Sequence, residues 1–481
     1  MAATVQPVYV KRCRLVSKKI SLQIELQKLV QYFSSLFNPT ILGGTNLNSI
    51  RNRYSYFAAE PVEIFEFFAS DKKPFEKLRT VLNKYSLDDI KRLENVFTGG
   101  WVGFFSYDLN TFIENVPACG TDDVKLPLIR LCFYDKVICF DHLRNCFYLF
   151  AIELPEDEKN GQEKIAQLEN ILNQAANVIP AKAGIQLYLA RRFTAGSFLS
   201  FKSNMTKDYY LDAFAKIKRY IYDGDVYQIN FSQRFSANFN SEPYKLFLWQ
   251  NKFNPSPYSA YLDAGDYQIV SASPELFINI NNGIITTCPI KGTRPRTYNK
   301  AVDEKNYKDL VESEKEKAEI DMIIDLERND LGRICDYGSI KVTKRRDIET
   351  FSTVFHAVST IQGRLREKID FVDCLKAIFP GGSISGAPKI SAMKIINALE
   401  PTARGLYTGS IGWFDLKGNA CLNIAIRTII IKDNVAFAQT GGGIVADSDP
   451  QAEWQETLVK AKALLAGIKA VQENNGAKGF F

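Results

Sequence analysis

The 481-residue chain contains only two histidines, His142 and His356. So few histidines exclude a histidine-rich metal centre and leave little scope for a serine or cysteine nucleophile paired with a histidine. The nine cysteines occur singly, and none belongs to a Cys-x-x-Cys pair. We therefore expect neither a zinc site nor a disulfide framework.

Long hydrophobic runs are also missing. No apolar stretch approaches the about 18–20 residues that a membrane helix needs, and the N-terminus lacks the charged-then-apolar layout of a secretion signal. The 60 basic and 54 acidic residues nearly balance, and no dense basic run with interleaved aromatic residues suggests nucleic-acid binding. These features predict a soluble, cytoplasmic protein in a reducing environment, without a nucleic-acid or membrane partner.

The most unusual stretch is PIKGTRPR, from Pro289 to Arg296. It follows alternating apolar residues that predict two short strands joined by a turn at Asn281-Asn282-Gly283. Lys291 is predicted at the end of the second strand, beside the two arginines of the same stretch. Nearby positive charge lowers the pKa of a lysine, and a neutral amine is a nucleophile. On these eight residues alone, a basic loop that binds an anion is the simpler interpretation.

Two pairs of glutamates have the same spacing. Glu316 and Glu319 are three residues apart on one predicted helix, and Glu453 and Glu456 are three apart on another, with Lys460 one turn later. Residues at this spacing share a helix face. Two such faces brought together would offer the oxygen ligands that Mg²⁺ prefers. The alternative is that both pairs lie on solvated faces of charged helices.

Other candidates stand on predicted strands. Glu275 precedes Lys291 by 16 residues, and a hairpin would bring both to one end of a sheet. Arg427 is expected in mid-strand, where a partly buried guanidinium needs an anionic partner, either a ligand or a structural carboxylate. Gly441 to Gly443 offer backbone N–H groups for a carboxylate or phosphate. For His356, a place in the core is the default interpretation.

Composition changes suggest where the chain divides. Residues 155–200 pass from an acidic stretch through a helix to a proline- and glycine-marked loop. We therefore divide the chain into an N-terminal region, 1–190, a second region, 191–470, and a polar tail, 471–481.

Four elements of the second region matter below. A single charged helix is expected over residues 303–326, and a flexible loop over 380–388. Helices are expected over residues 389–399 and from 451 to about 470.

Taken together, several stretches resemble one enzyme family. They are SPE, PIKGTRPR, AEIDMIIDLERNDLGRI, FHAVS, GGSISGAPK, RGLYTGSIG, IAIRT and GGGIVADSDPQAEWQETLVKAKA. In this order they resemble the chorismate-utilising enzymes, which include anthranilate, aminodeoxychorismate, isochorismate and salicylate synthases. The resemblance covers about residues 200–465, and the N-terminal region is similar to the first two only. It implies an α+β fold, with two antiparallel β-sheets packed face to face, helices around them, and residues 1–190 interleaved with the core.

The resemblance also implies roles for the candidates. It gives Mg²⁺ as the cofactor, held by Glu319 and Glu456 with support from Glu316 and Glu453. It gives Lys291 as the nucleophile, Glu275 as the acid that protonates a departing hydroxyl, and His356 as a histidine near the reacting ring. The positions that it implies for holding substrate carboxylates are Gly292, Thr293, Tyr407, Arg427, Gly441, Gly442, Gly443 and Lys460.

Lys291 distinguishes branches within the family. Anthranilate synthases typically carry alanine at this position, whereas PIKGT resembles the aminodeoxychorismate synthases. That branch aminates chorismate at C4 through a lysine adduct, on the route to 4-aminobenzoate and folate. The alternative is an anthranilate synthase, which aminates at C2 and releases pyruvate. No glutamine amidotransferase segment is recognised in the sequence, so we expect ammonia to come from a separate glutaminase subunit.

Overall fold

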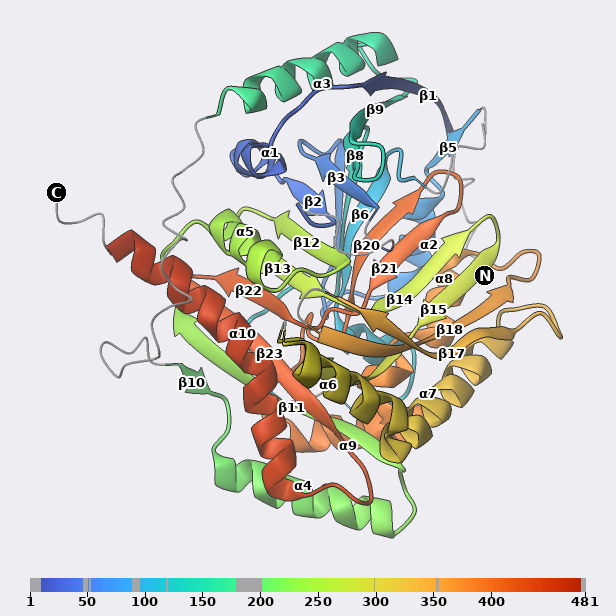
Figure 1. Cartoon of the computed structure of the whole chain (residues 1–481). Helices are drawn as coiled ribbons and strands as arrows, with labels where there is room; N and C mark the ends of the chain where they lie inside the picture. Colours follow the sequence, from blue (N-terminus) through green and yellow to red (C-terminus); the bar gives the residue numbers. More distant parts are fainter. Residues whose placement is uncertain are drawn as a thin grey trace.

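The structure is a computed structural model of the whole chain (Figure 1). It describes residues 10–45, 51, 53–88, 96–117, 120–178, 201–297, 299–351 and 354–476, with no side-chain description for 474–476. The expected division between residues 190 and 191 lies outside the described residues. No helix formed by the described residues is long and apolar enough to cross a membrane.

Thirteen of the described strands form the first sheet. In spatial order its main path is β10 (Lys202–Ser203), β11 (Gln228–Asn238), β23 (Val435–Ile444), β22 (Thr428–Lys432), β13 (Tyr267–Ser273), β12 (Tyr258–Asp263), β2 (Thr40–Leu42), β3 (Tyr54–Ala58), β8 (Lys136–Asp141), β9 (Cys146–Glu153), β1 (Lys11–Ile20) and β5 (Tyr85–Leu87). β19 (Gly386–Ala387) pairs with β11 beside this path. Strands from both ends of the sequence therefore share this sheet.

Ten described strands form the second sheet. Its main path is β16 (Ile290–Pro295), β18 (Val354–Arg364), β15 (Ile284–Cys288), β14 (Leu276–Asn281), β21 (Ala420–Asn423), β20 (Ser410–Asp415), β6 (Gly100–Phe105), β7 (Ile129–Tyr134) and β4 (Glu63–Phe67), with β17 (Lys341–Thr350) beside β18. All pairs are antiparallel except that of β1 with β5 in the first sheet. The β14–β15 turn is the expected one, with φ of 51° at Asn282 and 76° at Gly283.

Helices cover the outer faces of the two sheets (Figure 1). The helices are α1 (Leu26–Phe33), α2 (Pro74–Leu82), α3 (Gly161–Ala176), α4 (Lys207–Tyr222), α5 (Pro243–Phe253), α6 (Lys300–Glu312), α7 (Glu314–Gly332), α8 (Phe371–Ile378), α9 (Lys389–Leu399) and α10 (Pro450–Gly476), with 3₁₀ turns η2 (Tyr107–Phe112) and η4 (Gly382–Ile384). Apolar residues of α1, α3, α5 and α10 pack on the first sheet. Those of α2, α7 and α8 pack on the second.

A continuous apolar layer joins the two sheets. Phe104 of the second sheet and Ile269 of the first are both fully buried in one cluster, which also holds Val137 and Trp413. Burial of such side chains from two facing sheets supplies the main stabilising term. The predicted fold of two antiparallel sheets packed face to face with surrounding helices is confirmed.

Some predicted element boundaries were wrong. The charged helix expected over 303–326 is two helices, because Ser313 ends α6 and its side chain accepts a hydrogen bond from Glu316 N at the start of α7. The stretch 380–388 is buried rather than flexible, since it forms η4 and pairs with β11 through β19. Helix α9 has its predicted bounds, whereas α10 continues to Gly476.

Candidate active site

Lys291 lies on a strand of its own. β15 ends at Cys288, and Lys291 belongs to β16, which pairs with β18 at the edge of the second sheet. It therefore does not end the hairpin strand, as the sequence suggested, but follows it after a break at Pro289.

The Lys291 amine approaches the glycine-rich end of β23. A Cβ atom at Gly443 would lie 3.6 Å from Lys291 Nζ and 2.2 Å from Nε2 of Gln228 on β11. The glycine therefore leaves space that any side chain would fill. Both amide atoms of Gln228 are buried without a hydrogen-bond partner among the described residues. A buried polar group without a partner is costly, so this amide is available to a ligand or an ordered water.

Burial lowers the pKa of Lys291. The charges of Glu319 and Glu275 oppose the shift, and that of Lys460 adds to it. The direction matches the sequence prediction, but the predicted cause was wrong. Arg294 is ion-paired with Glu316 at 2.8 Å, and Arg296 donates a hydrogen bond to the carbonyl of Phe351, so neither arginine is directed at the amine.

Glu275 is buried beside this lysine. Its Oε1 accepts a hydrogen bond from Ser383 Oγ at 2.7 Å and a longer one from the backbone N–H of Ile290 at 3.4 Å. Burial raises its pKa, although Ser383, Lys291, Ile290 and Lys460 all favour the ionised form. A carboxyl group with a raised pKa holds its proton to higher pH than an ordinary carboxyl group and can deliver it to a leaving group.

The two glutamate pairs face the same centre from different helices. A Cβ atom at Gly292 would lie 2.8 Å from Glu316 Oε2 of α7. A Cβ atom at Gly442 would lie 2.9 Å from Glu453 Oε2 and 3.7 Å from Glu456 Oε1 of α10. Glu316, Glu453 and Glu456 therefore point toward the backbones of β16 and β23, although the Glu456 side chain is still 47% exposed. Figure 1 shows α10 crossing β23 and β11, with α6 and α7 at its side.

The carboxylates differ in charge state and partners. Burial raises the pKa of Glu319 and that of Glu453. Burial acts to raise the pKa of Glu456, but Lys460 at 2.7 Å, together with Lys291 and Lys315, outweighs it, so the net shift of this pKa is downward. Glu316 Oε2 and Glu453 Oε2 are buried without hydrogen-bond partners among the described residues. Each helix therefore presents one carboxylate oxygen without a hydrogen bond, and that of Glu316 lies 3.8 Å from Arg346 Nη2.

The residues fit a magnesium ion that is shared with a substrate. In the described part of the chain, no three His, Cys, Asp or Glu side chains are close enough to form a complete metal cage. Mg²⁺ typically keeps several waters and binds one or two carboxylates together with an anionic substrate. The carboxylate oxygen of Glu453 on α10 that accepts no hydrogen bond among the described residues suits that arrangement, whereas Glu316 on α7 is ion-paired with Arg294 and Arg346.

His356 lies in the core behind Thr293. Its Nδ1 is 2.8 Å from Thr293 Oγ1, and its ring meets that of Phe351 edge to face. Burial lowers the pKa of His356 to about 3, with the charge of Arg427 adding to the shift. The ring is therefore neutral near pH 7, and it orients the Thr293 hydroxyl beside Gly292.

This neutral histidine should make folding sensitive to acid. The unfolded chain protonates His356 near its ordinary pKa of 6.5, whereas the folded chain does so only near 3. Protons then favour the unfolded state as the pH falls from about 6.5 toward 3, so stability is lost over that range. Urea unfolding of His356→Asn at a series of pH values should show a shallower loss than the unsubstituted protein. Parallel curves would contradict this expectation.

Arg427 was predicted in the middle of a strand, but the structure places it outside any strand. It lies between β21 and β22 with φ of 50°, a left-handed conformation that is uncommon outside glycine. Burial lowers its pKa, and the charge of Glu275 opposes that shift. Among the described residues no carboxylate lies within ion-pair distance of its guanidinium. A structural carboxylate partner is therefore not found, and the guanidinium is available to an anionic ligand.

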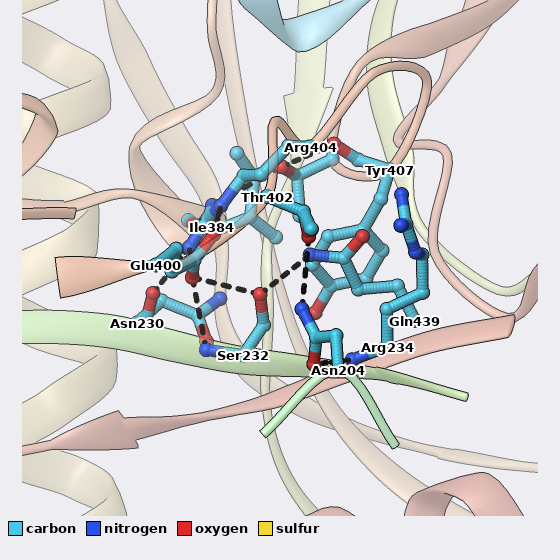
Figure 2. A network of polar contacts seen from close by, with 11 residues as sticks. Asn204, Asn230, Ser232, Arg234, Ile384, Glu400, Thr402, Arg404, Tyr407 and Gln439 are labelled. Carbon is cyan, nitrogen blue, oxygen red and sulfur yellow. Dashed lines mark hydrogen bonds and ion pairs between the residues drawn. The ribbon is translucent and has the colours of Figure 1, made fainter. Parts of the chain in front are cut away.

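Tyr407 belongs to a neighbouring polar network (Figure 2). The buried Arg404 guanidinium lies 5.6 Å from the Tyr407 ring and donates hydrogen bonds to both carboxylate oxygens of Glu400. Arg404 also donates to the carbonyls of Asn230 and Ile384, and Glu400 accepts from Ser232 on β11. The network thus fixes β11 to the 380–388 stretch. Tyr407 also lines a cavity of about 30 Å³, together with Asp108 and Arg234.

The structure thus groups most of the predicted residues and adds others. Lys291, Glu275, the four glutamates, the glycines and Lys460, whose amine donates to Gly441 O at 2.9 Å, surround one centre. Tyr407 contacts Arg404 instead. Sequence reasoning missed Ser383, because its stretch looked like a flexible loop, and Glu327, because it stood within a run of charges.

Comparison with known proteins shows which family the sequence resembles. The family model for chorismate binding enzymes matches residues 45–466. The chain is 41% identical over 377 residues to aminodeoxychorismate synthase component 1 of Bacillus subtilis (strain 168), covering 78% of each chain. It is 40% identical over 380 residues to anthranilate synthase component 1 of Pseudomonas aeruginosa, covering 79% of this chain and 76% of the relative.

A solved structure shows the same fold. Anthranilate synthase component I from Streptococcus pneumoniae superposes with a TM-score of 0.72 at 34% identity, covering 86% of this chain and 93% of that one. The family model matches most of the sequence, and the relatives have high identity and coverage. Both findings lead to the same conclusion. The chain belongs to the family of chorismate binding enzymes.

Proposed function

We propose that this enzyme aminates chorismate at C4 with ammonia and forms 4-amino-4-deoxychorismate. The observation that carries the proposal is the buried Lys291 amine between Gly443, Gln228 and Glu275. A lysine with a lowered pKa is a nucleophile, and a protonated carboxyl group beside it can assist a leaving hydroxyl. Relatives named aminodeoxychorismate synthase component 1 support the same assignment.

The residues account for a balanced two-step reaction. The neutral Lys291 amine attacks C2, the ring double bonds shift, and the C4–O bond breaks as Glu275 gives its proton to the leaving hydroxyl. Ammonia then forms the C4–N bond, the lysine leaves C2, and ionised Glu275 takes a proton from the new ammonium. The net change is the replacement of one hydroxyl by an amino group, with water as the other product.

The surrounding groups would position the substrate. Arg427 and the N–H groups of Gly441 to Gly443 would bind carboxylates, with Thr293 and Lys460 at the rim. Glu319 and Glu456, supported by Glu316 and Glu453, would hold Mg²⁺. When bound, the ion supplies positive charge that offsets the substrate carboxylate and favours departure of the hydroxyl. This reaction would serve 4-aminobenzoate and folate synthesis.

Relatives named component 1 imply a second component. We propose that this partner is a glutamine amidotransferase subunit that supplies ammonia. Ammonium salts should replace the partner in a test of the single chain.

Product identification tests the proposed reaction. The purified protein, incubated with chorismate, Mg²⁺ and ammonium, should form aminodeoxychorismate without pyruvate, as followed by chromatography with mass detection and a coupled pyruvate assay. Anthranilate synthase relatives at 40% identity make amination at C2 the competing reaction. Fluorescent anthranilate formed together with an equal amount of pyruvate would replace our assignment with that one.

The metal assignment predicts a change in magnesium demand. Glu456→Gln should raise the Mg²⁺ concentration for half-maximal activity by about 10-fold or more, because one carboxylate that faces the ion loses its charge. Titration calorimetry with Mg²⁺ alone should show the same weakening without turnover. Glu304→Gln, a change at an exposed glutamate of α6, is the matched control and should behave as the unsubstituted protein. Turnover without any divalent ion would contradict the assignment.

A further inference from the structure

Glu327, a carboxylic acid, lies on the buried face of α7. Ile320, Ile323, Ile324 and Leu331 form this face, and Glu327 occupies a position among them with only 5% of its surface exposed. A buried carboxyl group is unfavourable unless it is hydrogen-bonded or takes up a proton. Burial raises the pKa of Glu327 to about 7, with the charge of Asp330 adding to the shift. Glu327 can therefore change its charge near neutral pH.

Glu327 contacts the backbone of η4. Its Oε1 accepts a hydrogen bond from Gly382 N at 3.3 Å. A Cβ atom at Gly382 would lie 2.5 Å from Leu326 Cδ2 and 3.3 Å from Glu327 Oε1, so the backbone of η4 lies directly on α7. The neighbouring Asp330 is ion-paired with Lys389 at the start of α9, which leaves Glu327 as the carboxyl group that reaches η4.

The next residue in the chain connects η4 to Glu275. Ser383 Oγ donates to Glu275 Oε1 at 2.7 Å, and Glu275 also accepts from the backbone beside Lys291. Two buried carboxyl groups thus bind adjacent residues of η4 from opposite sides. Any shift of η4 toward or away from α7 would move the donor that holds Glu275.

We propose that Glu327 is a positioning residue for Glu275, which supports η4 from α7 and, when ionised, keeps the proton on Glu275. The proposal rests on the proposed function, because Glu275 is the acid of that reaction. The charged groups that face Glu275 are Lys291, Lys460 and Arg427, and those that face Glu327 are Asp330, Lys389 and Glu275 itself.

The direction of the effect follows from like charges. Below about pH 7 Glu327 is protonated and adds no charge. As the pH rises past this value, Glu327 loses its proton, and its negative charge then disfavours ionisation of Glu275. Ionised Glu327 therefore opposes Ser383, Lys291 and Lys460, which favour ionised Glu275, and holds the proton on Glu275 to higher pH than those groups alone would allow. The alkaline limb of the pH profile of kcat/KM reports the group that must be protonated in the free enzyme.

Glu327→Gln tests the proposal in the ammonium-dependent assay. The amide keeps an oxygen for Gly382 N–H but cannot become negative, so the alkaline limb should move to lower pH. A move of one pH unit lowers kcat/KM relative to the unsubstituted enzyme by about 10-fold on the alkaline side and leaves the acid side unchanged. A uniform loss at every pH, or an unmoved limb, would overturn the proposal.

Two further variants separate charge from contact. Glu327→Asp keeps the charge but shortens the reach to Gly382, so kcat should fall while the limb stays in place. Ser383→Ala removes a hydrogen bond that favours ionised Glu275, so the limb should move to higher pH, opposite to Glu327→Gln. If Glu327→Asp moved the alkaline limb of the kcat/KM profile as far as Glu327→Gln does, the charge of Glu327 would not be the cause of the shift. The identity of the product that the unsubstituted enzyme forms tests the proposed function separately. The alkaline limb of the pH profile can be measured whether that product is aminodeoxychorismate or anthranilate.

Discussion

Lys291→Ala is expected to lower ammonium-dependent turnover of chorismate by about 10³-fold or more, because the substitution removes the amine that we propose to form the covalent bond at C2. The same variant should show no covalent adduct when the enzyme and chorismate are denatured and weighed as intact protein by mass spectrometry. Among the described residues Lys291 has no ion-pair partner within 4.0 Å, so its removal breaks no ion pair there and the fold should persist.

The matched control is Lys308→Ala on α6. Lys308 is exposed, its ion pair with Glu312 is 3.8 Å long, and its loss should leave turnover unchanged. An adduct that forms in Lys291→Ala would identify a different nucleophile. A loss of turnover without any adduct in the unsubstituted enzyme, even under rapid quenching, would point to direct attack by ammonia.

Glu400→Ala is expected to destabilise the folded protein by about 3–5 kcal/mol, since it leaves the guanidinium of Arg404 buried without its charge partner. Both side chains are almost fully buried, and Glu400 also accepts hydrogen bonds from Ser232 N and Oγ (Figure 2). Urea unfolding should show the midpoint falling by a corresponding amount. Activity should fall as well, because Arg404 links Asn230 on β11 to Ile384.

An exposed ion pair provides the comparison. Glu312→Ala breaks a pair of the same charges on the surface of α6, and such a change should cost less than about 1 kcal/mol. Replacing both members of the buried pair by apolar residues, Glu400→Leu with Arg404→Met, should recover part of the stability lost in Glu400→Ala. If Glu400→Ala and Glu312→Ala lowered the free energy of unfolding by equal amounts, burial would not determine the strength of the network around Arg404.

Local chemistry predicted some elements accurately and missed others. The turn at Asn281-Asn282-Gly283 was predictable because two successive residues with positive φ need Asn and Gly. The break at Ser313 was not, since a run of lysines and glutamates continues on both sides and has good helix propensity. The 380–388 stretch looked flexible because its glycines were visible, whereas the partners that bury it, β11 and Glu275, are distant in sequence.

Some features of the candidate site were likewise predictable from local sequence, and others were not. The spacing of each glutamate pair predicted a shared helix face, but the approach of the two helices to Gly292 and Gly442 depends on the fold. The lowered pKa of Lys291 was predicted for the wrong reason, because burial is a tertiary property that no neighbouring residue reveals. Glu327 and Ser383 have no sequence signal that separates them from ordinary helix and loop residues.

The pairing of β6 with β20 has a consequence for synthesis of the chain. Ser410 lies opposite Phe105, so 305 residues separate two strands that are neighbours in the second sheet. At about 5–20 residues per second, a ribosome needs roughly 15–60 s to reach the second strand after completing the first. Throughout that interval one side of β6 lacks its backbone partner, and an unpaired edge favours association between chains. Newly made protein should therefore depend on chaperones until residues near the C-terminus emerge.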